Sequence, residues 1–192
     1  MRSSVAVLGL IAVLLMGGCG TSAPQVKPTL REVPPSSAIL VGRFGALSRA
    51  GQGLFYELQA FQVETKKKWK LPLSAGDGDG NSNSVPFFLE LPPGLYLLTK
   101  WMYMTNSQEY SGENAGVLFD LAPGQVTCIG AVYMGSRGII PNTHGSSTQF
   151  RGGTVLRDEC DALAAQFKTK APLLPAPVKK LARGATEQRA AP

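Results

Sequence analysis

The sequence predicts an all-β domain, an antiparallel sandwich of about seven strands with one C-terminal helix. Two observations carry this prediction. Short apolar stretches separated by turn residues fill the middle of the chain, and a strand–Pro-Gly–strand unit occurs twice. The composition agrees with this fold. The 22 Gly and 14 Pro among 192 residues are many turn-forming residues, and 44% hydrophobic residues are too many for a wholly disordered chain.

The N-terminus has the form of an export signal. Arg2 supplies a positive charge, and residues 5–16 form an uninterrupted apolar run. A helix of that length spans roughly 18 Å, which is too short for the ~30 Å hydrocarbon core of a bilayer. A charged start, a short apolar run and small residues after it are typical of a secretory signal. We therefore expect residues 1–18 to be removed as a signal peptide.

The residues that follow, Gly17-Gly18-Cys19, resemble the lipobox of bacterial lipoproteins. That motif usually has Leu or Val and then Ala or Ser ahead of its cysteine, where this chain has Met16 and Gly17. The resemblance implies cleavage before Cys19 and a diacylglyceryl group on its sulfur, and two or more acyl chains hold a protein firmly at a membrane. By resemblance to lipoprotein sorting in enteric-type bacteria, Gly20 rather than Asp after the cysteine favours the outer membrane, facing the periplasm, over retention in the inner membrane. The alternative is a plain secretory signal cut near Ala23.

The segment after the cysteine predicts a tether. Residues 19–37 show no apolar period and contain four prolines: Pro24, Pro28, Pro34 and Pro35. Proline-rich segments of this kind are extended and act as spacers. We expect the tether to lift the domain off the bilayer surface.

The core is expected over residues 38–170. Strand-like stretches lie at 38–44, 54–64, 69–73, 85–91, 95–105, 116–121 and 126–134. Apolar residues alternate with others in 85–91, which gives one largely apolar face. The stretch 95–105 is apolar on both faces apart from Lys100, as expected of a central strand.

The turn unit is LELPPG at 89–94 and FDLAPG at 119–124. Proline sets φ to about −65° at the second turn position and glycine supplies a positive φ at the third, which is the type II pattern. Type II turns splay the strands of a hairpin, so we expect arches that carry the chain between two sheets.

The period changes after Arg157. Apolar residues then recur on one face of a helix: Cys160, Leu163, Ala164 and Phe167. Asp158 can cap this helix and Pro172 ends it. Residues 171–192 combine prolines with lysines and arginines and are predicted to be a disordered basic tail.

Residues 38–170 carry a second resemblance. PPGLY at 92–96, FDLAPG at 119–124 and CIG at 128–130, followed by a terminal helix, resemble poorly characterised bacterial lipoproteins with PPGxY and PGxxxYIG patterns. The resemblance implies an Ig-like or prealbumin-like sandwich. Its motifs are turn chemistry and specify fold more than activity. Cys128 stands where that pattern usually has an aromatic residue.

Three cysteines in an exported chain leave one unpaired. If lipid takes Cys19, Cys128 and Cys160 remain, and an oxidising compartment favours their pairing. Cys128 lies on the strand after the second turn unit, and Cys160 lies on the helix face that must pack on the sandwich. We predict a disulfide between them, the alternative being two buried free thiols.

Two surfaces are candidates for ligand contact. Lys67 and Lys68 beside Trp69 could meet anionic headgroups or cell-wall polymers, although lysines also protect edge strands from aggregation. Trp101 and Tyr103 could form a sugar-stacking platform, which requires both to be exposed, although aromatics on a central strand are more often core.

Other chemistry has little support in the sequence. One His and three Cys exclude the common His/Cys metal sites, and a dispersed net charge of +6 does not suggest a nucleic-acid partner. We expect no catalytic set and no cofactor. Asp77 and Asp79 begin a calcium-like pattern without its later glycine and glutamate, so a plain loop is predicted. His144 is expected to be a solvated loop residue.

The sequence thus predicts a non-catalytic, membrane-anchored lipoprotein of the bacterial cell envelope. It would act as a binding or assembly module, with an envelope protein or a cell-wall polymer as partner. The alternatives are a glycan-binding module that uses Trp101 and Tyr103, and an enzyme with an unrecognised site.

Overall fold

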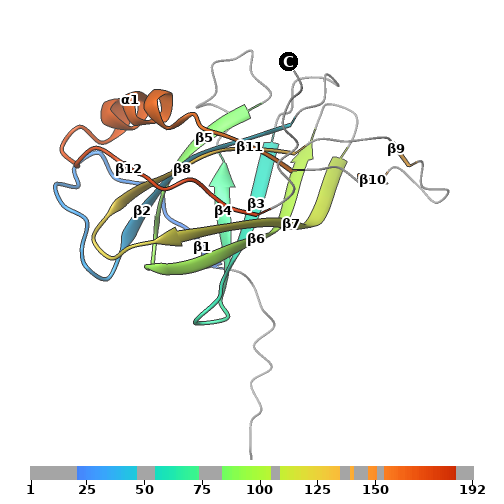
Figure 1. Cartoon of the computed structure of the whole chain (residues 1–192), viewed down its shortest axis with the longest axis horizontal. Coiled ribbons are helices and arrows are strands. Elements are labelled where there is room, and N and C mark those ends of the chain that lie inside the picture. Colours follow the sequence, from blue (N-terminus) through green and yellow to red (C-terminus); the bar gives the residue numbers. More distant parts are fainter. Residues whose placement is uncertain are drawn as a thin grey trace, which may run out of the picture.

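The computed structural model describes residues 21–46, 55–73, 84–104, 109–134, 139–140, 147–150 and 154–184. They form two β-sheets and a helix (Figure 1). The strands are β1 (Thr21–Ser22), β2 (Ala38–Ala46), β3 (Phe55–Gln62), β4 (Lys68–Leu73), β5 (Ser84–Leu91), β6 (Gly94–Met104), β7 (Glu109–Leu121), β8 (Val126–Met134), β9 (Ile139–Ile140), β10 (Ser147–Phe150), β11 (Thr154–Arg157) and β12 (Val178–Lys179), and the helix is α1 (Cys160–Lys170). The prediction of a β-rich fold with a helix near the C-terminus is confirmed.

The sheets are mixed, which differs from the antiparallel sandwich predicted. The larger has the order β1-β4-β3-β6-β7-β10-β9, and the smaller has the order β11-β8-β2-β5 with β12 also beside β8. β2 runs antiparallel to β5 but parallel to β8. The strands β1, β9 and β12 were not predicted. Each has two residues, which are too few to show an alternating pattern.

The two Pro-Gly turns are arches, as predicted. The first leads from β5 in the smaller sheet to β6 in the larger, and the second leads from β7 back to β8. Gly94 and Gly124 have φ of 138° and 65°, a region that side chains avoid. The Tyr96 hydroxyl donates a hydrogen bond of 2.7 Å to the Pro92 carbonyl, and the Tyr96 ring stacks on Phe119. The tyrosine of the PPGLY motif therefore fastens its own arch.

One apolar core lies between the sheets and a second lies under the helix. The inner core takes residues from both sheets, among them Leu40, Phe44, Phe87, Leu58, Leu98 and Phe119. The second joins α1 to the outer face of the smaller sheet, through Ile39, Val41, Phe88, Leu163 and Phe167. Phe88 alternates with the inward residues of β5, and its ring lies 5.7 Å from that of Phe167. The smaller sheet is thus covered on both faces.

The helix begins beside the cysteine pair, one residue later than a cap at Asp158 predicts. Glu159 is its N-cap and makes no side-chain cap bond, while Asp158 accepts a hydrogen bond from the Cys160 amide at 3.4 Å. The Cα atoms of Cys128 and Cys160 lie 5.8 Å apart and the two sulfurs form a bridge. That separation lies within the usual range of disulfides.

Residues 21–37 correct the prediction of a tether over 19–37, because they lie against the sandwich. Thr21 and Ser22 pair with β4, the Ala23 amide donates to the Lys70 carbonyl at 2.8 Å, and the Val26 amide donates to the Phe88 carbonyl at 3.0 Å. Ala23 is buried. An edge strand leaves backbone groups unpaired, and an extended segment satisfies them without any apolar period of its own.

Residues 171–184 correct the prediction of a disordered tail over 171–192. β12 pairs with β8, and Arg183 exchanges two backbone hydrogen bonds with Leu118 of β7, at 2.7 and 2.8 Å. Ala171, Leu174 and Ala182 are buried. Lys179 pairs with Asp158, and its hydrogen bond holds the pKa of that carboxyl below the ordinary value. These contacts were not predicted, because the residues that make them are too far apart in the sequence to form a recognisable pattern.

The predicted disulfide can be tested by counting thiols. In denatured, non-reduced protein we expect neither Cys128 nor Cys160 to react with a thiol reagent. The bridge closes a sequence separation of 32 residues, so Cys128→Ser/Cys160→Ser should lower the free energy of unfolding by about 3–4 kcal/mol. Two reactive thiols in the denatured protein would refute the pairing.

The C-terminal segment can be tested by truncation. A chain that ends at Pro177 loses the backbone bonds of Lys180, Ala182 and Arg183 to β8 and β7. At about 1 kcal/mol for each bond, the free energy of unfolding should fall by roughly 2–5 kcal/mol in urea titrations. A chain that ends at Gly184 is the control and should keep its stability. Equal stability of the two truncated chains would show that the segment does not support the fold.

Candidate functional site

The sequence-predicted site residues lie in separate parts of the fold. Lys67, Lys68 and Trp69 belong to the β3–β4 hairpin, Trp101 and Tyr103 belong to β6, and Cys128 and Cys160 join β8 to α1. Cys19, Asp77, Asp79 and His144 lie outside the described residues. The structure therefore does not bring the lysines together with the two β6 aromatics as a single surface.

The platform predicted on β6 is wrong for Trp101. Its side chain is only 7% exposed and belongs to the inner core. A Cβ atom at Gly112, on the neighbouring strand, would lie 2.6 Å from the indole ring, so the ring packs closely against the β7 backbone. The side chain of Tyr103 lies outside the described ones. A buried indole cannot stack on a sugar, and Trp101 is a core residue.

The β3–β4 hairpin carries a cluster of lysines, here called the basic hairpin: Lys66, Lys67, Lys68 and Lys70. All four are exposed. Trp69 lies between them in the chain but points inward and is 7% exposed, which corrects its assignment to a ligand surface. The Lys67 ammonium lies 4.3 Å from the centre of the Trp69 ring, so a cation–π contact holds it over the buried indole.

Polar contacts fix the turn of this hairpin to the first Pro-Gly arch. The Gln62 side chain donates to the Pro93 carbonyl at 2.9 Å and accepts from the Thr65 hydroxyl at 2.8 Å. The Glu64 carboxylate accepts from the Leu95 amide at 3.0 Å. These positioning residues were missed because hydrogen bonds between distant turns leave no local pattern in a sequence.

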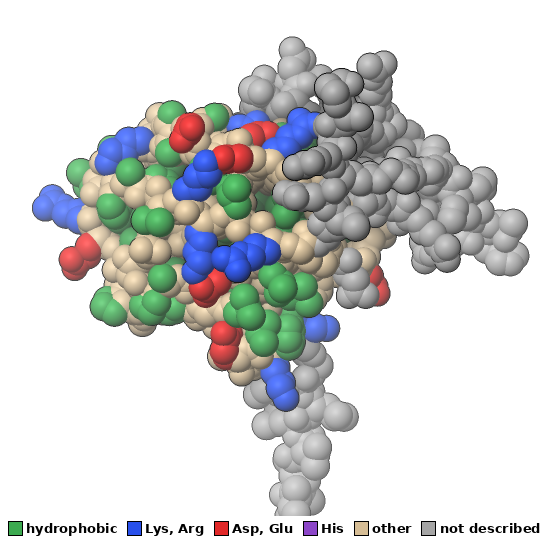
Figure 2. All heavy atoms as spheres, in the orientation of Figure 1, with side chains coloured by type: hydrophobic (Ala, Val, Ile, Leu, Met, Phe, Trp, Pro, Cys, Tyr) green, Lys and Arg blue, Asp and Glu red, His purple; other side chains and the backbone are tan. Residues whose placement is uncertain are grey.

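The chain enters the fold beside the basic hairpin. β1 runs parallel to β4, with Thr21 opposite Trp69 and Ser22 opposite Lys70. Because the pair is parallel and begins at Trp69, the chain reaches the sheet at the lysine-bearing end of β4. Figure 2 shows side chains of both charges at the bottom of the molecule, where Figure 1 places the turn of this hairpin.

A half-buried polar cluster lies elsewhere, between the smaller sheet and the start of α1. Arg43 Nε lies 3.2 Å from a Glu159 carboxylate oxygen, and the Tyr133 hydroxyl donates to the other oxygen at 2.7 Å. Burial and then the hydrogen bond to Glu159 raise the pKa of Tyr133. The cluster ties the helix N-terminus to β2 and β8. Within the described ranges, no three His, Cys, Asp or Glu side chains gather as metal ligands would.

No helix in the described part of the chain is long and apolar enough to cross a membrane. No known protein family matches the chain, and no curated protein matches it at a significant level. A leucine-rich repeat protein from Bacteroides thetaiotaomicron aligns with 61% of this chain and 14% of its own length, with a TM-score of 0.38 and 10% identity. This chain therefore spans a small part of that protein, and so distant a likeness carries no argument about function.

Proposed function

We propose that the protein is a lipid-anchored, non-catalytic protein of the bacterial cell envelope, attached to the outer membrane and facing the periplasm. It works by contact, with an envelope protein or a cell-wall polymer as partner. The observation that carries the proposal is the lipobox-like sequence ending at Cys19, two residues before Thr21 joins the larger sheet.

In this proposal the domain lies directly on the membrane. Two residues of extended chain span at most about 7 Å, so an acylated Cys19 stays close to the β1–β4 edge. The chain enters at the lysine-bearing end of β4, and the basic hairpin therefore faces the headgroups. Each lysine near an anionic membrane surface contributes about 1 kcal/mol of attraction.

The finer fold assignment is part of the same proposal. We infer a variant of the Ig-like or prealbumin-like sandwich. Its support is the pair of Pro-Gly arches between the sheets and the core that both sheets share. The variant differs from the predicted antiparallel sandwich in that β2 pairs parallel with β8.

Replacement of the anchor residue tests the proposal directly. In a bacterial host that processes lipoproteins, Cys19→Ser should abolish labelling by radioactive palmitate and leave the precursor uncleaved, because the lipid bond needs the sulfur. Cys160→Ser is the matched control and should keep both labelling and cleavage. Unchanged labelling and processing of Cys19→Ser would contradict the lipid anchor.

The orientation is tested with the chain from Gly20 onward, which holds every described residue. It should sediment with phosphatidylglycerol-containing vesicles at low salt and lose this binding as salt rises. Lys67→Gln/Lys68→Gln should weaken the binding about tenfold or more. Lys27→Gln/Arg31→Gln removes the same charge from exposed residues elsewhere and should have little effect. Equal losses in the two variants would show that net charge, and not the hairpin, governs the contact.

A further inference from the structure

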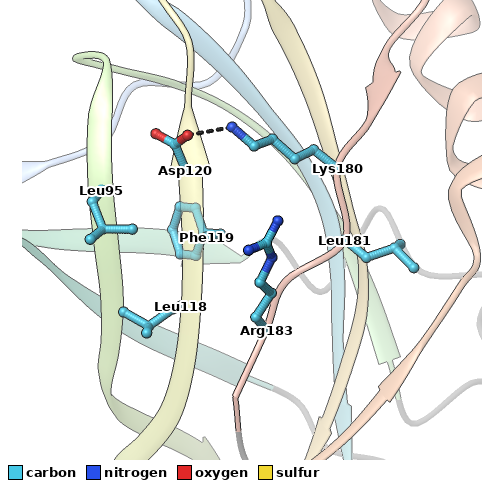
Figure 3. A pocket seen from close by; sticks show the side chains of 7 residues that line it. All are labelled: Leu95, Leu118, Phe119, Asp120, Lys180, Leu181 and Arg183. Carbon is cyan, nitrogen blue, oxygen red and sulfur yellow. Dashed lines mark hydrogen bonds and ion pairs between the residues drawn. The ribbon is translucent and has the colours of Figure 1, made fainter.

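A pocket of about 440 Å³ lies between the C-terminal segment and strands β6 and β7. Figure 3 shows the side chains that line it: Leu95, Leu118, Phe119, Asp120, Lys180, Leu181 and Arg183. Its volume falls within the roughly 300–1,000 Å³ of small-molecule sites. The C-terminal segment forms one wall, held in place by the two backbone bonds between Arg183 and Leu118.

The charges of the residues that line the pocket do not cancel. Lys180 is paired with Asp120. Among the described residues no carboxylate pairs with Arg183, whose guanidinium lies between the C-terminal segment and the strand that carries Asp120 (Figure 3). The three charged side chains therefore give the pocket a net positive charge, carried by the Arg183 guanidinium. A guanidinium binds carboxylate or phosphate through two parallel hydrogen bonds.

The walls beside this cation are apolar and partly open to solvent. Leu118 is 38% exposed and Leu181 is 40% exposed, and both rank among the most exposed large hydrophobic side chains that the structure describes. Val63, also 40% exposed, donates its amide to the Leu95 carbonyl and so lies next to the pocket. Figure 2 shows an apolar area in the part of the molecule where Figure 1 places β6, with Lys and Arg side chains directly above it.

We propose that this pocket binds an amphipathic anion, a molecule with one carboxylate or phosphate group and an aliphatic chain. Arg183 receives the anionic group, and Leu95 and Leu118 contact the chain. Asp120 lowers the net positive charge of the pocket because it forms an ion pair with Lys180. The proposal rests on the pocket alone and does not depend on the lipid anchor.

The size of the feature favours a small molecule over a protein partner. A stable protein interface covers about 800 Å² on each partner. Here the apolar exposure centres on a concave site whose walls come from two strands and a short segment. An open concave site lined by three leucines, a phenylalanine and three charged residues has the composition of small-molecule sites.

The test uses calorimetric titration of the chain from Gly20 onward with four probes. Decanoate and decyl phosphate should bind and raise the melting temperature, since a ligand of the folded state stabilises it. Decyltrimethylammonium has a comparable chain with the opposite charge, and acetate has the carboxylate without the chain, so both should bind at least about tenfold more weakly. Equal binding of decyltrimethylammonium, or no binding of either anion, would overturn the proposal. If only one of the two anions binds, that result identifies the headgroup.

Matched variants locate the binding. Arg183→Gln should weaken binding of decanoate about tenfold, whereas Arg31→Gln, at another exposed arginine, should not. Leu118→Asn should weaken it, whereas Leu173→Asn, at a leucine that is 53% exposed and lies outside the pocket, should not. Asp120→Asn should strengthen it, because Lys180 then becomes available. Equal effects within either matched pair, or weaker binding by a folded Asp120→Asn variant, would place the binding elsewhere.

Discussion

The open edges of two stacked sheets are the constraint on which the rest of this structure depends. Backbone groups at a sheet edge need partners, and the two ends of the chain supply them here. Near the N-terminus, Ala23 bonds to Lys70 of β4 and Val26 bonds to Phe88 of β5. Near the C-terminus, Lys180 bonds to Cys128 of β8 and Arg183 bonds to Leu118 of β7. Each terminal segment thus joins one sheet to the other along an open side.

This arrangement also positions the two surfaces for which contact with other molecules is proposed. The N-terminal segment enters the larger sheet at the lysine-bearing end of β4, so Thr21 and the basic hairpin lie together. The C-terminal segment turns the outer surface of β6 and β7 into a pocket, because without Lys180, Leu181 and Arg183 only the surface of the two strands would remain. Both candidate surfaces therefore follow from the closure of the edges.

Local chemistry made part of this fold predictable. Proline before glycine indicated arches, and Gly94 and Gly124 adopt the positive φ that the pattern requires. The spacing of Cys160, Leu163 and Phe167 indicated one buried helix face, and all three are buried. The parallel β2–β8 pair, the docking of both termini and the pocket depend on pairing between distant segments, which leaves no periodicity to detect. Trp69 was wrongly predicted to lie on a ligand surface, because the neighbouring lysines suggested exposure. The alternation of side chains along β4 turns its indole inward.

Strand β8 connects these features to one another. Cys128 bonds through its sulfur to Cys160 of the helix, and its carbonyl accepts the Lys180 amide at 2.9 Å. One residue thus fixes both the helix on the outer face and the segment that forms the pocket wall. Tyr133, further along the strand, holds Glu159 at the helix N-terminus. Because β8 is buried at every position except Tyr133, neither attachment can shift without disturbing the core. The pocket wall is therefore attached to a buried strand of the smaller sheet, although the segment that forms it has almost no secondary structure of its own.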